Sequence, residues 1–168
     1  EEFLEGPEVS VLAFTDGNVV VPMVSSMDHK RAKDNDEGLN TGGMGTVAPN
    51  PYYTKKIADE CYDKIFVPTI EAMKKEGREF SGCLYFGLML TKKGPKVIEY
   101  NCRFGDPETQ VVLPLLKSDL FEIMLKISDK NLKKEDVQFM DKSAACVVMA
   151  SDGYPVSYEK GFEITPRT

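Results

Sequence analysis

Two oxygen-bearing side chains, Glu99 and Asn101, stand two residues apart in a segment rich in strand-forming residues. Side chains alternate between the faces of a strand, so Glu99, Asn101 and Arg103 are expected on one face. Ile98 and Tyr100 are then expected on the opposite face of the strand. Carboxylate and carboxamide oxygens suit Mg²⁺ or Mn²⁺, and a neighbouring guanidinium suits a phosphate. Spacing alone still favours the simpler alternative, which is the solvated face of a half-covered strand.

The residues that follow this strand predict a turn that opens a helix. Gly105, Asp106 and Pro107 stand in a row, and proline is common at the first position of a helix. Asp106 has two interpretations. It is either an N-cap, which is the more frequent role, or a carboxylate beside the metal face that could hold an ammonium group.

A second candidate site is the glycine-rich segment Asn40–Gly45. Its glycines would let backbone N–H groups converge on an anion without side-chain obstruction. Basic residues lie upstream of it, in the segment Asp28–Arg31. A flexible, solvated loop is the alternative, because one glycine-rich loop is a weak signal and no GK[ST] follows it. The candidate site residues in these two segments are Asp28, Lys30, Arg31, Asn40, Thr41, Gly42 and Gly43.

The first eight residues, Glu1–Glu8, form an acidic stretch that leads into an apolar run. By themselves they indicate a solvated strand edge with a turn at Gly6 and Pro7.

The elements that must position these residues alternate between hairpins and helices. Hairpins are predicted over 8–23, with a DG turn, and over 82–101, with a turn through Lys92, Lys93 and Gly94. Helices are predicted after Thr54, which is a plausible N-cap, and over 115–127. Pro68 should kink or split the first helix. This order predicts an α+β fold with an antiparallel sheet packed against helices.

Two further features concern the organisation of the chain. Residues 25–51 are rich in Gly, Asn, Asp and Lys, and they are predicted to be a long functional loop. A polar stretch then precedes a predicted strand over 144–150. We therefore place a domain boundary near Lys142, with one domain over 1–142 and the start of a second small domain over 143–168.

Composition excludes several classes of protein. The net charge of −6 and a pI near 4.9 argue against nucleic-acid binding, which needs a basic face. No apolar run reaches the ~20 residues of a membrane span, so no membrane partner is expected. The four cysteines are dispersed without a CxxC pair, which is typical of reduced thiols in a cytoplasmic protein.

Taken together, the segments EEFLEGPE, SSMDHKR, NTGGMG, GCLYFGLML and VIEYNCRFGDPETQ resemble the ATP-grasp superfamily. Their order is similar to that of the glycinamide ribonucleotide synthetase family within it. The resemblance runs from Glu1 to about Met124. It implies the carboxy-terminal subdomain of an ATP-grasp fold, with ATP held between two α+β subdomains.

The resemblance also implies roles for particular residues. Glu1, Glu2 and Leu4 would form a hinge strand that reads adenine, and Glu8 would bind the ribose hydroxyls. Glu99 and Asn101 would hold Mg²⁺ against the ATP phosphates. Arg103 would neutralise the phosphoryl group in transfer, Asp106 would lie near the glycine amine, and the two loops described above would face phosphoribosylamine.

The implied reaction is the ATP-dependent ligation of glycine to phosphoribosylamine through glycyl phosphate, in purine biosynthesis. The amino-terminal domain and the lid subdomain are missing from this chain, which is expected to bind ATP weakly and to catalyse nothing alone. One alternative is another ATP-grasp ligase or a carboxylase component, which would lack the DHKR and NTGGMG segments. The other is a noncatalytic nucleotide-binding domain.

Overall fold

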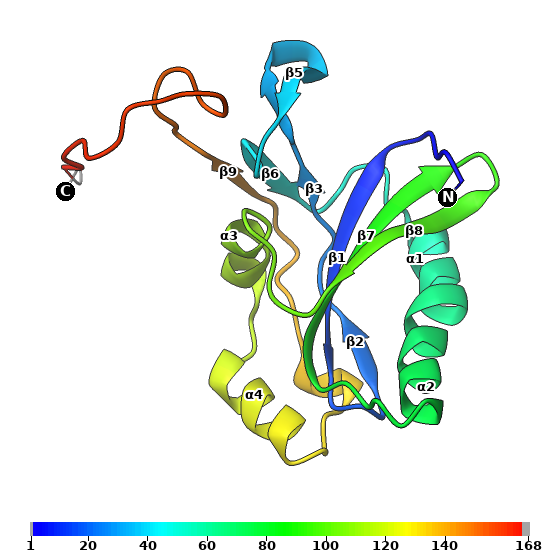
Figure 1. The fold of residues 1–168 in the computed structure, drawn as a ribbon. Helices are drawn as coiled ribbons and strands as arrows, with labels where there is room; N and C mark the ends of the chain where they lie inside the picture. The colour runs from blue at the N-terminus through cyan, green and yellow to red at the C-terminus, as the bar shows by residue number, and fades with distance from the viewer. Residues whose placement is uncertain (1, 166–168) are drawn as a thin grey trace.

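The computed structural model describes residues 2–165, which fold around a central antiparallel sheet (Figure 1). The strands are β1 (Glu8–Thr15), β2 (Val20–Pro22), β3 (Met27–Asp28), β4 (Arg31–Lys33), β5 (Glu37–Asn40), β6 (Gly45–Ala48), β7 (Gly82–Thr91), β8 (Gly94–Asn101) and β9 (Ala144–Val147). The α-helices are α1 (Lys55–Cys61), α2 (Val67–Lys75), α3 (Thr109–Val112) and α4 (Leu120–Ser128). The 3₁₀ turns are η1 (Asp34–Asp36), η3 (Leu113–Leu115) and η4 (Lys134–Asp136), and η2 (Tyr62–Phe66) is a π-helical turn.

The central sheet has the order β2-β1-β7-β8, and every neighbouring pair is antiparallel. Both predicted hairpins are confirmed. The β1–β2 turn is closed by Asp16, whose Oδ1 accepts hydrogen bonds from the backbone N–H groups of Asn18 and Val19 at 2.9 Å each. Gly17 takes a φ of 90° there, a conformation that favours glycine. The predicted α+β class with an antiparallel sheet is therefore confirmed.

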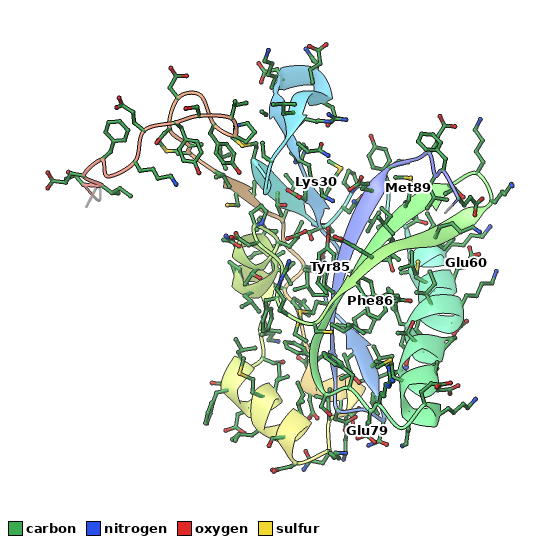
Figure 2. The ribbon with its side chains drawn as sticks, in the orientation of Figure 1. Lys30, Glu60, Glu79, Tyr85, Phe86 and Met89 are labelled. Carbon is green, nitrogen blue, oxygen red and sulfur yellow. The ribbon has the colours of Figure 1, made fainter. Side chains whose placement is uncertain are left out.

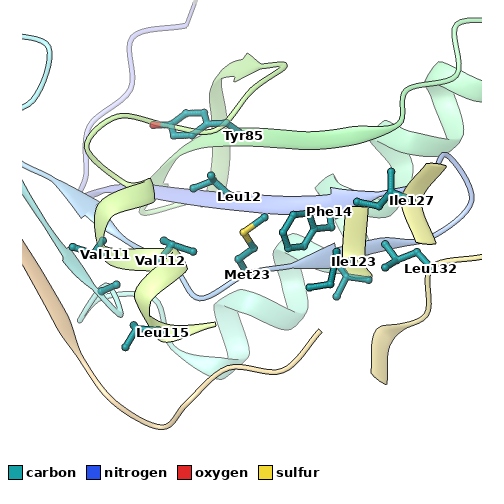
Figure 3. Packing of buried hydrophobic residues seen from close by; sticks show 12 residues of the cluster. Leu12, Phe14, Met23, Tyr85, Val111, Val112, Leu115, Ile123, Ile127 and Leu132 are labelled. Atoms are coloured by element: carbon teal, nitrogen blue, oxygen red, sulfur yellow. The ribbon is translucent and has the colours of Figure 1, made fainter. Parts of the chain in front are cut away.

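Alternation along β1 and β7 gives the sheet two buried faces, each with its own apolar core. The face toward η2 and α2 contains Val9, Val11, Ala13, Leu84, Phe86 and Leu88, packed with Cys61, Phe66 and Ile70. The opposite face contains Leu12, Phe14 and Tyr85, packed with Met23, Val111, Val112, Leu115, Ile123, Ile127 and Leu132 (Figure 3). Both faces of β1 are therefore covered, and this strand lies at the buried centre of the molecule.

The helix after Thr54 is split, as predicted. The Thr54 side chain caps α1 by accepting a hydrogen bond from the backbone N–H of Ile57 at 3.4 Å. A π-helical turn, η2, then separates α1 from α2. Pro68 lies in the first turn of α2, where it cannot donate a backbone hydrogen bond to the preceding turn. The prediction of an interruption at Pro68 is confirmed.

The helix predicted over 115–127 begins later than expected. Leu115 ends a 3₁₀ turn, and α4 starts only at Leu120. Asp119 sets this start, because its Oδ1 accepts hydrogen bonds from the N–H groups of Phe121 and Glu122 at 2.8 and 3.1 Å. The periodic apolar pattern continues from the 3₁₀ turn into α4 without a break. The predicted start of the helix was therefore wrong by about one and a half turns.

Residues 25–51 are not the irregular loop that composition predicted. They contain β3 to β6, of which β4 and β5 form a separate hairpin that projects from the molecule (Figure 1). β3 and β6 join β9 in a second sheet of order β3-β6-β9. The prediction of a loop was wrong because each of these strands spans only two to four residues and carries few apolar side chains.

β9 is shorter than the strand predicted over 144–150, and it pairs with β6 from Gly45↔Val147 to Ala48↔Ala144. Residues 148–165 form no helix or strand and run away from the sheets (Figure 1). The domain boundary near Lys142 remains a prediction. Within residues 2–165, no helix is long and apolar enough to cross a membrane.

Candidate functional site

Glu99 and Asn101 lie on the same face of β8. Asn101 pairs with Tyr85 and Glu99 with Gly87, so both stand on the face of the sheet that carries Tyr85. The register shifts between Gly87 and Leu88, and Ile98 is the extra residue of this bulge. Val97, rather than the Ile98 predicted from simple alternation, therefore shares the helix-facing side with Tyr100.

A cavity of about 120 Å³ brings together side chains from distant parts of the chain. Its lining residues are Asp28, Lys30, Gly42, Tyr85, Glu99, Asn101, Arg103, Asp106 and Glu108. The predicted metal pair thus lies with both predicted catalytic residues and with part of the predicted substrate loop. Gly87 makes room for this arrangement, because a Cβ there would lie 2.9 Å from the Glu99 Cγ.

A larger cavity of about 590 Å³ shares Asp28 and Lys30 with the smaller one. Its lining residues are Gly6, Pro7, Glu8, Met27, Asp28, His29, Lys30, Arg31, Asp36, Asn40 and Tyr52. Across it, the Lys30 Nζ forms an ion pair with the Glu8 Oε2 at 2.9 Å. Figure 2 labels Lys30 near the upper part of β1 and Tyr85 farther down on β7. Because Asp28 and Lys30 line both cavities, the two adjoin, and together they are called the polar region below.

The charges of this region perturb two of its groups. Burial and, to a lesser extent, the Glu108 carboxylate raise the pKa of Asp28 to about 6, although Lys30 and His29 oppose this rise. Burial lowers the pKa of Lys30, but the hydrogen bond to Glu8 and the charges of Glu8, Asp28 and Glu99 outweigh it. The pKa of Lys30 is therefore above its ordinary value, and its ammonium group stays charged.

The backbone N–H groups of the glycine segment already have partners inside the chain. Thr41 donates to the Lys30 carbonyl at 2.7 Å and Met44 to the His29 carbonyl at 2.8 Å. Gly42 donates to the Tyr154 hydroxyl at 3.1 Å, and Gly43 to the Thr41 Oγ1 at 3.0 Å. The structure therefore does not show these groups converging on an open anion site.

Close packing, rather than anion binding, explains why a glycine stands at position 43. Its φ is 118°, and a Cβ there would lie 2.4 Å from the Pro107 Cδ and 2.8 Å from the Asp28 Oδ1. Glycine thus lets residue 43 pack directly against both Pro107 and the Asp28 side chain. Asp28, which packs against Gly43, is one of the residues that line the smaller cavity.

The turn after β8 differs in detail from the prediction. The helix α3 begins at Thr109, and its N-cap position is Glu108 rather than Asp106. The exposed Asp106 instead accepts a hydrogen bond from the Gln110 Nε2 at 2.5 Å through its Oδ1. The N-cap interpretation of Asp106 was wrong. Arg103 is exposed, and its Nη1 donates to the Phe104 carbonyl at 3.0 Å.

Some predicted site residues lie elsewhere. Glu2 and Leu4 line neither cavity, residues 2–7 form no strand, and Glu2 forms an ion pair with Lys96 at 3.3 Å. Glu1 lies outside the described residues. Arg31 and Asn40 line only the larger cavity, where the Arg31 Nη1 donates to the Gly38 carbonyl at 2.8 Å.

Sequence reasoning missed three residues beside the predicted ones. Glu108 is 3% exposed, and its Oε1 accepts a hydrogen bond from the Ser10 Oγ at 3.0 Å. The Ser10 Oγ lies 2.9 Å from the Tyr85 hydroxyl. Ser10 is a polar residue inside an apolar run on β1, and this was the one signal in the sequence that could have pointed to a buried polar network.

The donor set suits a hard divalent cation. Glu99 and Asn101 offer a carboxylate and a carboxamide oxygen on one face, and Mg²⁺ commonly uses only one or two protein ligands with water and phosphate oxygens. Within residues 2–165, no group of three or more His, Cys, Asp or Glu side chains is arranged to hold a metal ion. The residues therefore fit an ion shared with a phosphorylated ligand better than a metal site made by the protein alone.

Comparisons with known proteins agree with this geometry. A crystal structure of phosphoribosylamine–glycine ligase from Thermotoga maritima superposes with a TM-score of 0.81 and 40% identity, covering 96% of this chain and 40% of that one. An L-amino acid ligase from Bacillus licheniformis gives a TM-score of 0.61 at 15% identity, over 90% of this chain and 37% of that one. The second likeness shows a shared fold alone. The fold and the site together define an ATP-grasp protein.

Sequence comparison narrows the class. A family described as phosphoribosylglycinamide synthetase, ATP-grasp (A) domain, matches residues 1–109. A phosphoribosylamine–glycine ligase of Caldanaerobacter subterraneus subsp. tengcongensis is 54% identical over 98% of this chain and 39% of its own length. The trifunctional purine biosynthetic protein adenosine-3 of Gallus gallus is 54% identical over 98% of this chain and 17% of its own length. The chain belongs to the phosphoribosylglycinamide synthetase ATP-grasp family, and it spans about two fifths of the first of these relatives.

Proposed function

We propose that the whole protein ligates glycine to 5-phosphoribosylamine in de novo purine biosynthesis. ATP is consumed, and the products are glycinamide ribonucleotide, ADP and phosphate. The observation that carries this proposal is that Glu99, Asn101 and Arg103 line one cavity in a chain of this family. The names of its relatives supply the substrates.

The proposed first step joins the glycine carboxylate to the γ-phosphorus of ATP, giving glycyl phosphate and ADP. Glu99 and Asn101 would hold Mg²⁺, which neutralises charge on phosphate oxygens when it is bound. Arg103 lies beside them on the same cavity and would stabilise negative charge on the transferred group. Asp106 lines that cavity too and is proposed to lie near the glycine amine.

In the proposed second step, the amine of phosphoribosylamine attacks the carbonyl carbon of glycyl phosphate. Phosphate leaves and the amine loses a proton. The contribution of the protein is chiefly positioning, because no side-chain nucleophile takes part. Lys30, Arg31 and Asn40 line the larger cavity and would face phosphoribosylamine, together with Thr41, Gly42 and Gly43.

The nucleotide is proposed to extend along the same polar region. Glu8 lines the larger cavity and would bind the ribose hydroxyls, while Glu1, Glu2 and Leu4 would read adenine. The amino-terminal and lid subdomains of the whole protein would complete this site. A cytoplasmic location is part of the proposal and is supported by four cysteines that form no disulfide.

The test is steady-state ADP formation by the full-length protein. It should require Mg²⁺, glycine and phosphoribosylamine together. Asn101→Ala should abolish it with the fold kept, whereas Asn131→Ala, an exposed residue, should not change it. Turnover with bicarbonate or a different amino acid would favour another ATP-grasp ligase or a carboxylase component. Absence of ADP formation would favour a noncatalytic domain.

The 168-residue chain by itself should bind ATP weakly and release no phosphate. If the chain alone released phosphate in a glycine-dependent manner, the proposal that the other subdomains are needed for activity would be contradicted.

A further inference from the structure

The glycine-rich segment Asn40–Gly45 lies against the segment that contains and follows β9. β6 begins at Gly45 and pairs with β9 in antiparallel register. Beyond the paired strands, the Val148 N–H donates to the Met44 carbonyl at 3.0 Å. A Cβ on Gly45 would lie 2.7 Å from the Cys146 carbonyl oxygen, so glycine permits this close pairing. The two segments therefore run side by side toward the smaller cavity.

Tyr154 extends this series of contacts to the edge of the candidate site. Its hydroxyl oxygen accepts a hydrogen bond from the Gly42 N–H at 3.1 Å, although the two residues are 112 positions apart. A Cβ on Gly42 would lie 3.6 Å from that oxygen. Gly42 lines the smaller cavity, whereas Tyr154 lines neither of the two cavities. The hydroxyl thus holds a residue of the site from outside it.

A turn with its own internal contacts presents the Tyr154 hydroxyl. The Tyr154 N–H donates to the Ser151 carbonyl at 3.2 Å, and the Ser157 N–H donates to the Gly153 carbonyl at 3.3 Å. Gly153 has a φ of 84°, and a Cβ there would collide with the Ser157 carbonyl oxygen. The Tyr158 ring packs edge-on against the Tyr154 ring, with their centroids 5.3 Å apart. The position of the hydroxyl is therefore set by the turn and by the partner ring.

The hydrogen bond from Gly42 restrains the middle of the glycine-rich segment. The residues on either side are held from within, because the Thr41 N–H donates to the Lys30 carbonyl and the Gly43 N–H to the Thr41 Oγ1. The Gly42 N–H uses the Tyr154 hydroxyl instead. A glycine has more backbone freedom than any other residue, so a peptide group held in one orientation depends on such a contact. Without the hydroxyl, that freedom would have to be lost when a substrate binds.

We propose that Tyr154 is a positioning residue for the phosphoribosylamine side of the site, acting through Gly42. This inference rests on the proposed function, in which Gly42 faces phosphoribosylamine. The residues proposed to bind ATP and Mg²⁺ on β1 and β8 belong to the central sheet, apart from the segment that Tyr154 holds. Loss of the hydroxyl therefore weakens the binding of phosphoribosylamine and leaves that of ATP unchanged. Tyr154 follows the domain boundary predicted near Lys142, so both parts of the chain contribute to the site.

The kinetic experiment compares Tyr154→Phe with the wild type in the full-length protein. Phenylalanine removes the hydroxyl and keeps the ring that packs on Tyr158. We expect the KM for phosphoribosylamine to rise about fivefold, the effect of losing one neutral hydrogen bond, with the KM for ATP within about twofold and an unchanged Tm. Tyr158→Phe removes a hydroxyl from the partner ring of the same turn. It is the matched control and should change neither KM.

Amide hydrogen exchange tests the contact without any turnover. Exchange at the peptide that contains Gly42, measured by mass spectrometry on the full-length protein, should be faster in Tyr154→Phe because the N–H group has lost its acceptor. Exchange at the same peptide should match the wild type in Tyr158→Phe.

Two results would overturn the inference alone. One is an unchanged KM for phosphoribosylamine in Tyr154→Phe, and faster exchange alongside it would show that the contact is only structural. The other is an equal rise of the KM values for phosphoribosylamine and ATP together with a lower Tm. A wild-type protein whose ADP formation does not depend on phosphoribosylamine would overturn the proposed function, and the kinetic role of Tyr154 with it.

Discussion

Replacement of Asp28 by asparagine should stabilise the chain at neutral pH and leave its stability unchanged in acid. In the folded chain burial and the Glu108 carboxylate raise the pKa of Asp28 to about 6 from an ordinary value of 3.8. The folded state therefore holds this proton more tightly than the unfolded state does. The cost of the charged carboxylate is absent below about pH 4, grows as the pH rises through the interval from 4 to 6, and is complete above it.

The size of this effect follows from the pKa. The rise corresponds to about 3 kcal/mol, and because Asp28 is only partly buried, screening by water reduces this to about 1 kcal/mol. Asp28→Asn should thus raise the free energy of unfolding by about 1 kcal/mol at pH 7.5 and by nothing measurable near pH 4.

Urea unfolding at both pH values, followed by circular dichroism, measures this difference. Asp141→Asn is the control, because the Asp141 side chain is exposed and accepts no hydrogen bond from residues 2–165, and its effect on stability should not depend on pH. A gain from Asp28→Asn that is the same at both pH values, or a loss at pH 7.5, would refute the electrostatic account of the cavity.

Three further substitutions test the elements that position the site. Phe86→Ala should destabilise the chain by about 3–5 kcal/mol in urea unfolding, because Phe86 is fully buried with its ring centroid 4.3 Å from that of Phe66; a loss under 1 kcal/mol would contradict this. Gly87→Ala should lower the activity of the full-length protein at least tenfold, since the new Cβ would displace Glu99; unchanged activity would show that Glu99 can move freely. Thr54→Ala should cost about 1 kcal/mol of stability through the lost helix cap, and an unchanged urea midpoint would argue against that cap.

Local signals made much of the fold predictable. The Asp16-Gly17 turn marked one hairpin, and alternation of side chains placed Glu99 and Asn101 on one face. The interruption at Pro68 was also predictable, because proline has no backbone N–H group to donate within a helix. In each case the determining interaction lies within a few residues, so it can be read without knowing the rest of the structure.

Other features could not be predicted because they depend on contacts between distant segments. The bulge at Ile98 depends on how β8 pairs with β7, and simple alternation cannot detect it. Gly43 indicated an anion site, yet in the structure it packs closely against Pro107 and Asp28, where a Cβ would collide with both. Nothing local marks Glu108 as buried, because its burial and its hydrogen bond depend on β1. Tertiary contacts of this kind are absent from any short window of sequence.

The central claim is that Glu99 and Asn101 act as one metal-binding unit at the nucleotide phosphates. Binding of Mn²⁺ to the full-length protein with ADP, followed by electron paramagnetic resonance, tests it most directly. We predict that Glu99→Gln and Asn101→Ala each weaken Mn²⁺ binding at least tenfold, and that the double variant is much less impaired than the product of the two single effects. Wild-type Mn²⁺ affinity in both single variants, or effects that simply multiply, would contradict the account.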